Sequence, residues 1–387
     1  MDVGSKRPSE LSDAEKQAWR AFVAADPALA SPYFALEFAE CCQEARDDTR
    51  VLVIRRGGQI IGFLPLHTGK LGYARPLAGP MGDVQGVITE PDVEVDLHEV
   101  LHKAGLPLFA FHAGLSSQKP FRDHADETVA SWMLDLSEGY EAWETRRGQV
   151  DSKAMRTLRG RRRKLGELER GHRYVMEETG EAAFDRMLEW KGQQYAATNV
   201  FNVFSVAWTR DLLKAVLRRK GEFFSGSCSS LYVGDELVSV HIGMESDRLS
   251  HYWFPAYHAD YAKLSAGVLL LTEAARAAAA KGHVALELGP GDFQFKRDLS
   301  SYQIGLARGC IANPSLLLAT RNAGRALTRT VETAPLGPVR QWPGKLMRKI
   351  DRLSGFYALR GTGPAPGLSR ARRDRIPRLR RRGCPGD

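Results

Sequence analysis

The sequence predicts an α+β protein with a mixed sheet, built from two similar units in tandem. Residues 51–67 and 231–244 each contain two strand-like runs around a tight turn, Arg56-Gly57-Gly58 and Gly234-Asp235-Glu236. Each hairpin comes after helical sequence and before a strand, a helix and another strand. The hairpins are about 175 residues apart, which indicates an internal repeat. The length of 387 residues also suits two domains.

The elements of both units are predicted from hydrophobic periodicity and from turn residues. The first unit is expected at 1–148, with helices at 12–25, 34–46 and 92–104, a hairpin at 50–67, and strands at 108–114 and 128–134. The second unit is expected at 149–312, after a link near Gly148. Around and beyond that link, helices are expected at 139–147, 150–168, 180–197, 205–219 and 265–281, and strands at 223–233, 236–245, 248–255, 283–288 and 302–311.

Residues 313–387 are expected to form a helical and basic extension. The segment 316–330 has a helical pattern, and Pro335, Pro338 and Pro343 interrupt any continuation of that helix. Residues 370–387 contain eight Arg and two Asp, which is +6 of the net charge of +9. We expect a partly disordered tail, which leaves open contact with an anionic membrane surface or an acidic partner, and no specific nucleic-acid binding.

Composition excludes several protein classes. No apolar run reaches the length of a membrane span, because Glu273 and Arg276 interrupt the best candidate at 264–280. The first ten residues are polar and lack the apolar core of a secretory signal. The five cysteines contain no CxxC pair, which argues against a disulfide framework and a zinc site. These features predict a cytoplasmic protein with no metal.

A loop of small residues, Ser265-Ala266-Gly267, opens the predicted helix at 265–281. Such a loop lets main-chain N–H groups approach an anion closely, and the helix dipole favours negative charge there. The loop therefore suits a pyrophosphate. Gly289-Pro290-Gly291 lacks the GxGxxG spacing of a dinucleotide-binding fold. We therefore reject a dinucleotide site at this segment.

The pattern 237–244, 249–257, 261–271, 286–291 and Phe295-Lys296 resembles the acetyltransferase domain of the GNAT superfamily. It is similar to the CelD-like or BioF-like branch associated with cellulose and exopolysaccharide synthesis. Over about residues 20–312, the tandem arrangement resembles the FemAB-like peptidyltransferases. The resemblance implies tandem acyl-CoA N-acyltransferase domains. It departs from the branch at Ala266, where Pro is frequent, and at Phe295, where Tyr is frequent.

The resemblance also implies a cofactor site. The strands at 248–255 and 283–288 are expected to separate, and acetyl-CoA or another acyl-CoA to lie between them as co-substrate. Its pyrophosphate is expected at the amides of Leu264, Ser265, Ala266, Gly267 and Val268, and its pantetheine arm at the backbone of Trp253, Phe254 and Pro255. The first unit has Asp92, Glu94 and Asp96 at the corresponding helix start, and these carboxylates repel an anion. We therefore expect one cofactor site per chain.

Candidate catalytic residues lie on the hairpin formed by the predicted strands at 236–245 and 248–255. If its turn is centred near Asp247, His241 is opposite Trp253 and Gly243 is opposite His251, so that His241, Glu245, His251 and Trp253 share one face. Either histidine suits a general base, with Glu245 to orient or replace it. Ordinary hydrogen-bonded sheet histidines are the alternative. We expect a backbone amide near Phe254 to meet the thioester oxygen.

Further candidates come after the strand at 283–288. Asp292 and Lys296 suit binding of acceptor hydroxyls or a phosphate, with a helix cap and a solvated lysine as the alternative. Tyr302 is a weak candidate for protonating the thiolate. The helix at 180–197 offers groups appropriate for a sugar, although a solvent-facing helix is equally consistent: Trp190, Lys191, Gln194 and Tyr195.

Three functions are consistent with these features. The first is acyl transfer from acyl-CoA to an amine or hydroxyl of a sugar, nucleotide-sugar or glycan precursor. The second is FemAB-like aminoacyl transfer from tRNA, although the sequence contains no recognisable helical-hairpin insertion. The third is a non-catalytic scaffold that binds polysaccharide-synthesis proteins through its tail and the basic helix at 153–164.

Overall fold

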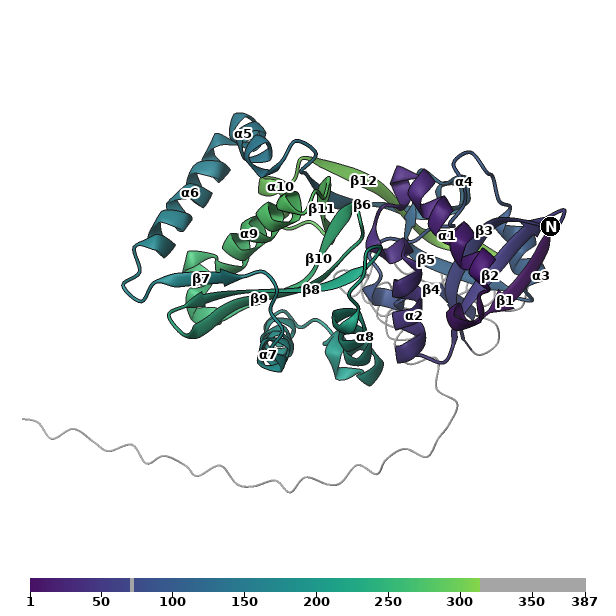
Figure 1. Cartoon of the computed structure of the whole chain (residues 1–387), viewed down its shortest axis with the longest axis horizontal. Helices are drawn as coiled ribbons and strands as arrows, with labels where there is room; N and C mark the ends of the chain where they lie inside the picture. Colours follow the sequence, from purple (N-terminus) through teal and green to yellow (C-terminus); the bar gives the residue numbers. More distant parts are fainter. Residues whose placement is uncertain (70–72, 314–387) are drawn as a thin grey trace, which may run out of the picture.

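The computed structural model describes residues 1–69 and 73–313, which form a twelve-stranded mixed sheet with helices on both faces (Figure 1). The strands are β1 (Asp2–Lys6), β2 (Thr49–Arg56), β3 (Gln59–Thr68), β4 (Tyr73–Pro76), β5 (Leu108–Leu115), β6 (Ala125–Asp135), β7 (His172–Val175), β8 (Ser225–Val233), β9 (Glu236–Glu245), β10 (Leu249–Tyr257), β11 (Ala285–Pro290) and β12 (Tyr302–Ala312). The helices are α1 (Asp13–Ala25), α2 (Leu36–Ala45), α3 (Leu97–Lys103), α4 (Lys119–Asp123), α5 (Tyr140–Val150), α6 (Ser152–Gly166), α7 (Glu181–Ala197), α8 (Ala207–Arg218), α9 (Ala266–Ala280) and α10 (Gln294–Leu299).

The predicted fold class is confirmed, and the differences are local. The sequence does not predict β1, β4 and β7, which have four or five residues each and too short a pattern to recognise. Helix α3 begins at Leu97 instead of residue 92, because the Asp96 side chain accepts hydrogen bonds from the next amides and caps the helix. Gly148 lies inside α5 and not in a link. The predicted helix at 316–330 and the basic tail are outside the described residues.

The two units exchange their last strands. The strand order is β1-β2-β3-β4-β5-β12-β6-β11-β10-β9-β8-β7. Strand β12, from the second unit, pairs antiparallel with β5 of the first, whereas β6, from the first unit, pairs antiparallel with β11 of the second. In Figure 1 the yellow-green β12 accordingly runs toward the purple half of the molecule. The two units therefore share one sheet, and the domain limits 1–148 and 149–312 remain a prediction.

The hydrophobic core differs between the two faces of the sheet. On one face, α1, α2, α7 and α8 cover a single core that includes Trp19 and Phe38 of the first unit and Met187 and Leu212 of the second. On the other face, α5, α6 and α9 cover one core and α3 and α4 cover another. The shared core holds the first unit firmly against the strands that carry the candidate site.

No helix in residues 1–69 and 73–313 combines the length and the apolar character that a membrane crossing needs.

Candidate active site

The parallel strands β10 and β11 pair over three residues and then separate. The pairs are Leu249 with Ala285, Ser250 with Leu286 and His251 with Glu287, whereas β10 continues to Tyr257 and β11 to Pro290. The register of β11 against β6 also shifts beyond Glu287. The separation that the resemblance implied is therefore present, and it begins immediately after the pair His251 and Glu287.

A β-bulge in β10 lies at the same point. Against β9, His251 is opposite Met244, and the next pair is Phe254 with Ile242, so Tyr252 and Trp253 form the bulge. The predicted register is one residue off, because the first pair beyond the turn is Glu245 with Ser250. A shift of one residue moves side chains to the opposite face of a sheet. The predicted shared face of His241, Glu245, His251 and Trp253 is therefore wrong.

His241 and Glu245 lie on the face covered by α9. The His241 ring stacks on Tyr252 at a centroid distance of 3.8 Å, and its Nδ1 is 3.1 Å from Ser229 Oγ. Burial, with the charge of His251, lowers the pKa of His241 well below its usual value, so the ring is neutral. Glu245 pairs with Lys281 at 2.9 Å. Neither residue reaches the side of the sheet on which His251 lies.

His251 lies in a buried polar cluster on the opposite face. Its Nε2 is 3.2 Å from the Tyr33 hydroxyl and 3.3 Å from Asp83 Oδ2, and its Nδ1 is 3.2 Å from Glu287 Oε2, without hydrogen-bond alignment to that oxygen. Two buried serines donate to the Glu287 carboxylate, Ser31 at 2.8 Å and Ser131 at 3.0 Å. Four of these partners, Tyr33, Asp83, Ser31 and Ser131, come from the first unit.

The charges of this cluster make His251 an imidazolium. Burial disfavours the charged ring, but the Asp83 and Glu287 carboxylates outweigh burial and raise the pKa of His251 to about 9. Burial likewise opposes the Glu287 carboxylate, but its contacts with His251 and the two serines lower the pKa of Glu287. The His251 side chain is 0% exposed and both ring nitrogens face carboxylates, which leaves no free nitrogen for an acceptor. It therefore does not offer the accessible neutral base that we expected.

Gly289 brings Asp83 and Lys296 to this cluster. Gly289 has a positive φ of 71°, and a Cβ there would lie 2.5 Å from Asp83 Oδ2 and 3.5 Å from the His251 ring. Lys296 donates to the carbonyls of Gly289 and Pro290 at 2.9 and 2.7 Å. Burial lowers the pKa of Lys296 to about 8, although Asp83 and Glu287 oppose this. The Asp83 side chain is 27% exposed, so it is the member of the cluster that faces outward.

The start of α9 offers fewer free amides than we expected. Ser265, with a left-handed φ of 56°, uses its N–H on the Ala262 carbonyl, and the Val268 N–H bonds to Ser265 O. Leu264 belongs to the 3-10 helix η7 (Ala259–Leu264). Within the described residues, the amides of Ala266 and Gly267 have no acceptor; Ala266 is fully buried, and Gly267 is partly exposed. The Tyr257 ring would be 3.3 Å from a Cβ at Gly267.

Several other predicted residues lie away from the cluster. Asp292 is 69% exposed and pairs with Arg297, so its side chain does not face His251. The Trp253 indole donates to Met81 O at 3.0 Å and Phe254 packs on Phe204, so only the backbone of these residues remains for a ligand in the separation. Tyr302 is 45% exposed on β12. In α7, Trp190 is buried and Gln194 has a buried amide nitrogen without a partner in the described residues.

The residues present are compatible with acyl-CoA. The strand separation, the orphaned amides of Ala266 and Gly267 and the missing side chain at Gly267 suit an extended ligand that ends in an anionic group. No side chain caps the start of α9, so no carboxylate competes there. In the described parts of the chain, no group of three or more His, Cys, Asp or Glu side chains is placed to hold a metal ion.

Comparisons with known proteins agree with this geometry. Residues 152–297 match the acetyltransferase (GNAT) domain family. No curated protein matches the chain. The crystal structure of FemX matches with a TM-score of 0.56 and 9% identity, over 83% of this chain and 99% of that one.

Two further solved structures match with lower TM-scores. One is the C-terminal domain of a putative lysylphosphatidylglycerol synthetase from Agrobacterium fabrum, with 13% identity and a TM-score of 0.49 over 81% of this chain and 96% of that one. The other is a tandem GNAT protein from the clavulanic acid biosynthesis pathway, with 12% identity and a TM-score of 0.47 over 81% of this chain and 99% of that one. The family match over residues 152–297, together with the FemX match, shows the fold of a GNAT-type acyltransferase in that region.

Proposed function

We propose that this chain transfers an acyl group, acetyl in the simplest case, from acyl-CoA to an amine or hydroxyl of a sugar or glycan precursor. The observation that carries the proposal is the separation of β10 and β11 directly beyond His251 and Glu287. Parting two parallel strands leaves main-chain donors and acceptors unpaired, and an extended ligand can satisfy them. The separation lies within the region that matches the GNAT domain family.

Acyl-CoA would supply an activated thioester carbonyl to this separation. The backbone of Trp253, Phe254 and Pro255 would hold the pantetheine arm, and the amides that open α9 would hold the pyrophosphate. Helix α6 supports this arrangement because it contacts both η7 and α9. Its exposed side is strongly cationic and would attract the phosphates of the ligand; the residues are Lys153, Arg156, Arg159, Arg163 and Lys164.

We assign Asp83 as the general base that takes a proton from the attacking group of the acceptor. Its carboxylate is the outward-facing member of the cluster, and His251 holds it from the buried side. His251 is thus a positioning residue, and Glu287 keeps its ring charged. A backbone amide in the bulge near Phe254 would stabilise the developing oxyanion. In a direct transfer, the acceptor nitrogen or oxygen would bond to the thioester carbon while Asp83 takes its proton, and the C–S bond would then break; the departing CoA thiolate would regain that proton from Asp83.

The sugar acceptor is the finer part of the proposal. The partly exposed Gln194 and Tyr195 lie on α7, which packs over β9 and β10 beside the cluster, whereas Trp190 is buried in the core. Aromatic and amide groups of this kind suit a sugar. With the resemblance to the CelD-like and BioF-like branch, they favour a role in exopolysaccharide biosynthesis. Contacts of the basic tail with synthesis proteins or an anionic membrane surface belong to residues outside the described ranges.

Acetyl-CoA binding to the full chain is the first test. We expect acetyl-CoA to raise the melting temperature by a few degrees, because a ligand that binds only the folded state stabilises it. Gly267→Glu should abolish the shift by placing a carboxylate at the start of α9. Gly267→Ala controls for the added volume, and Ala280→Glu adds the same charge at the other end of the helix. A full shift with Gly267→Glu, or no shift with the unaltered chain, contradicts the proposal.

Acyl transfer is the second test. Release of free CoA thiol from acetyl-CoA should depend on an amino sugar or a sugar hydroxyl, and a radiolabelled acetyl group should appear on that sugar. Activity that instead requires aminoacyl-tRNA would replace the proposal by a FemAB-like aminoacyl transfer. A chain that binds no acyl-CoA, but captures a polysaccharide-synthesis protein only while residues 370–387 are present, would support a scaffold.

A further inference from the structure

Two lysines near the cluster, Lys296 of α10 and Lys191 of α7, have hydrogen-bond donors that no acceptor uses in the described residues. An ammonium group has three N–H donors, and Lys296 uses two of them on the carbonyls of Gly289 and Pro290. Lys191 of α7 has no hydrogen bond or ion pair within the described residues, and its ammonium lies 5.9 Å from the centre of the Tyr195 ring. Lys296 therefore keeps one donor and Lys191 keeps three.

The two ammonium groups lie within Coulomb range of one another. Burial, and then the charge of Lys296, lower the pKa of Lys191 to about 8, so Lys191 still carries its charge at neutral pH. Asp83 lies against Gly289, whose carbonyl accepts from Lys296. The Asp83 carboxylate and the Lys296 ammonium thus lie at the same turn, and Lys191 lies on α7, which packs on β9 and β10.

The charges of five groups in and near the cluster do not balance. His251, Lys191 and Lys296 are cationic, and Asp83 and Glu287 are anionic, so the five groups sum to +1 at neutral pH. The His251 charge is already matched by the two carboxylates that contact it. A buried or half-buried cation without a partner is unfavourable unless something anionic binds to it.

We propose that Lys191 and Lys296 bind an anionic group of the acyl acceptor, a carboxylate or a phosphate, beside Asp83. The inference rests on the proposed function, because it names the acceptor class for the same site. Lys296 donates to the group from α10, and Lys191 supplies a second ammonium group from α7. The acceptor is then an acidic or phosphorylated sugar, and its nucleophile lies next to the Asp83 carboxylate.

Binding of simple anions to the full chain tests this site directly. We would titrate sodium phosphate and sodium acetate calorimetrically at constant ionic strength, in the Gly267→Glu variant as well as the unaltered chain. The variant removes phosphate binding at the start of α9, so the remaining binding reports on the lysines. The anion that binds more tightly identifies the class of group. Phosphate alone points to a phosphorylated acceptor, and acetate alone to a uronic-type acid.

Lys191 is the residue to change, because Lys296 also holds the turn at Gly289. Lys191→Met should weaken binding at least about tenfold, as expected for loss of a charge-assisted contact, and Lys191→Arg should restore it. Lys214→Met is the matched control, because Lys214 is an exposed lysine over the Phe184 ring at 5.5 Å. Anion binding that survives in Lys191→Met, or no anion binding at all, overturns the inference.

The outcome separates this site from the proposed function. Loss of anion binding in Lys191→Met with a persistent acetyl-CoA shift supports both. An acetyl-CoA shift that Gly267→Glu abolishes, with anion binding indifferent to Lys191, keeps the function and rejects the anion site. If anion binding depends on Lys191 but the chain does not bind acetyl-CoA, the anion site is supported and the proposed acyltransferase function is rejected.

Discussion

The two units contain equivalent pairs of parallel strands, β4 with β5 and β10 with β11, and the space beyond each pair is used differently. In the first unit, the strands pair only at Tyr73 with Leu108 and Ala74 with Phe109. The chain itself then fills the separation, because the Gln85 N–H bonds to Ala113 O at 2.9 Å and Gln85 O accepts from Leu115 N at 2.8 Å. In the second unit, the separation borders the charged cluster around His251.

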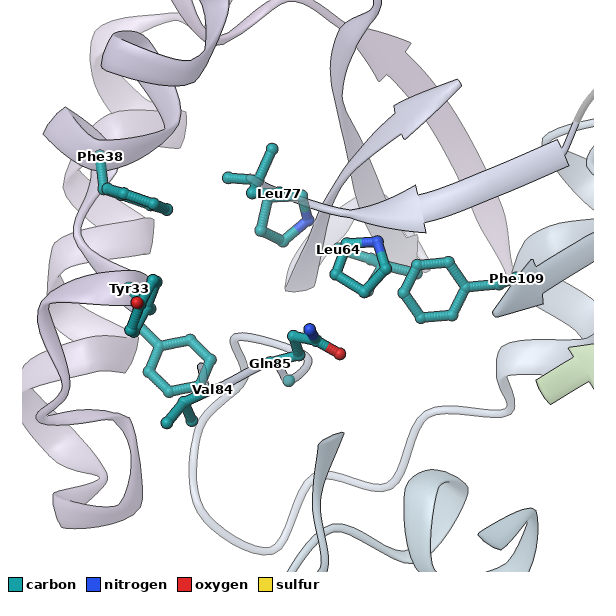
Figure 2. A pocket seen from close by; sticks show the side chains of 11 residues that line it. Tyr33, Phe38, Leu64, Leu77, Val84, Gln85 and Phe109 are labelled. Atoms are coloured by element: carbon teal, nitrogen blue, oxygen red, sulfur yellow. The ribbon is translucent and has the colours of Figure 1, made fainter. Parts of the chain in front are cut away.

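Figure 2 shows the small pocket that remains at the first separation. Gln85 and Val84 project into the space between Leu64 and Phe109 of the strands and Tyr33 and Phe38 of the helical side. The remaining cavity is about 20 Å³, room for about one water molecule. The same segment carries Asp83, which reaches the second site. The segment 83–85 thus fills the separation in the first unit and supplies Asp83 to the candidate site in the second.

The helices that connect the two strands of each pair, α3 and α9, also differ between the units. Helix α3 starts behind Asp96, whose carboxylate accepts from the amides of His98 and Glu99. Helix α9 starts behind Ser265 without any side-chain cap. An anion would meet occupied donors and a negative charge in the first unit, and orphaned donors in the second. The expectation of one cofactor site per chain is consistent with this contrast and stays a prediction.

The largest expected effect comes from removing the outward carboxylate. Asp83→Asn keeps the shape of the side chain but cannot take a proton, so the rate of acyl transfer should fall by about 10²- to 10⁴-fold. The acetyl-CoA melting shift should persist, because Asp83 is not assigned to that ligand. The exposed Asp92→Asn in the same unit is the control. Full activity in Asp83→Asn would show that Asp83 is not the base.

Breaking the buried ion pair should strongly destabilise the fold. Glu287→Gln leaves His251 with one carboxylate in a buried site, and the free energy of unfolding should fall by about 3–5 kcal/mol. Glu245→Gln removes the more exposed ion pair with Lys281 and should cost less than about 1 kcal/mol. Urea unfolding measures both. Equal losses for the two variants would mean that the cluster is no more buried than the surface pair.

The raised pKa of His251 predicts a pH dependence of stability. The folded-state value of about 9 exceeds the unfolded value, so the stabilisation is fully present below about pH 6.5 and disappears as the pH rises through 9. Urea unfolding between pH 6 and pH 10 should show this loss, and Glu287→Gln should flatten it. A stability that stays level up to pH 10 would show that His251 is neutral in the folded chain.

Opening the sealed separation should have a moderate effect. Gln85→Ala removes a side chain whose Oε1 accepts from the His112 and Ala113 amides at 3.0 and 3.1 Å, which should cost about 1–3 kcal/mol of stability. The exposed Gln193→Ala is the control. The acetyl-CoA shift should not change, since Gln85 serves only the first separation. A shift that vanishes would indicate that the ligand binds in the first unit.

The smallest effect is expected at the start of α3. Asp96→Ala removes its cap and should cost about 1 kcal/mol of stability. The number of acetyl-CoA molecules bound per chain, measured by calorimetry, should remain one, because the adjoining separation is already filled. A second bound molecule would mean that the Asp96 carboxylate alone prevents acetyl-CoA from binding to the first unit.

The order of helices and strands and the chemical contrast between the two helix starts are both predictable from the amino-acid sequence. Hydrophobic periodicity and turn residues act over a few neighbouring positions, so long elements such as α9 and β9 are predicted to within two residues. The carboxylates of 91–96 and the small residues of 265–267 are visible without a structure. The separation of β10 and β11 is accessible from the sequence only through resemblance to a family.

The composition of the candidate site, in contrast, depends on the tertiary structure. Ser31 and Glu287 are 256 residues apart and Tyr33 and His251 are 218 apart, and no local pattern contains such pairings. The register of β9 and β10 depends on one residue in a turn, and that residue places His241 and Glu245 on the opposite face. The exchange of β6 and β12 is long-range as well. Local preferences fix which elements form, whereas packing of the shared sheet and core fixes which side chains meet.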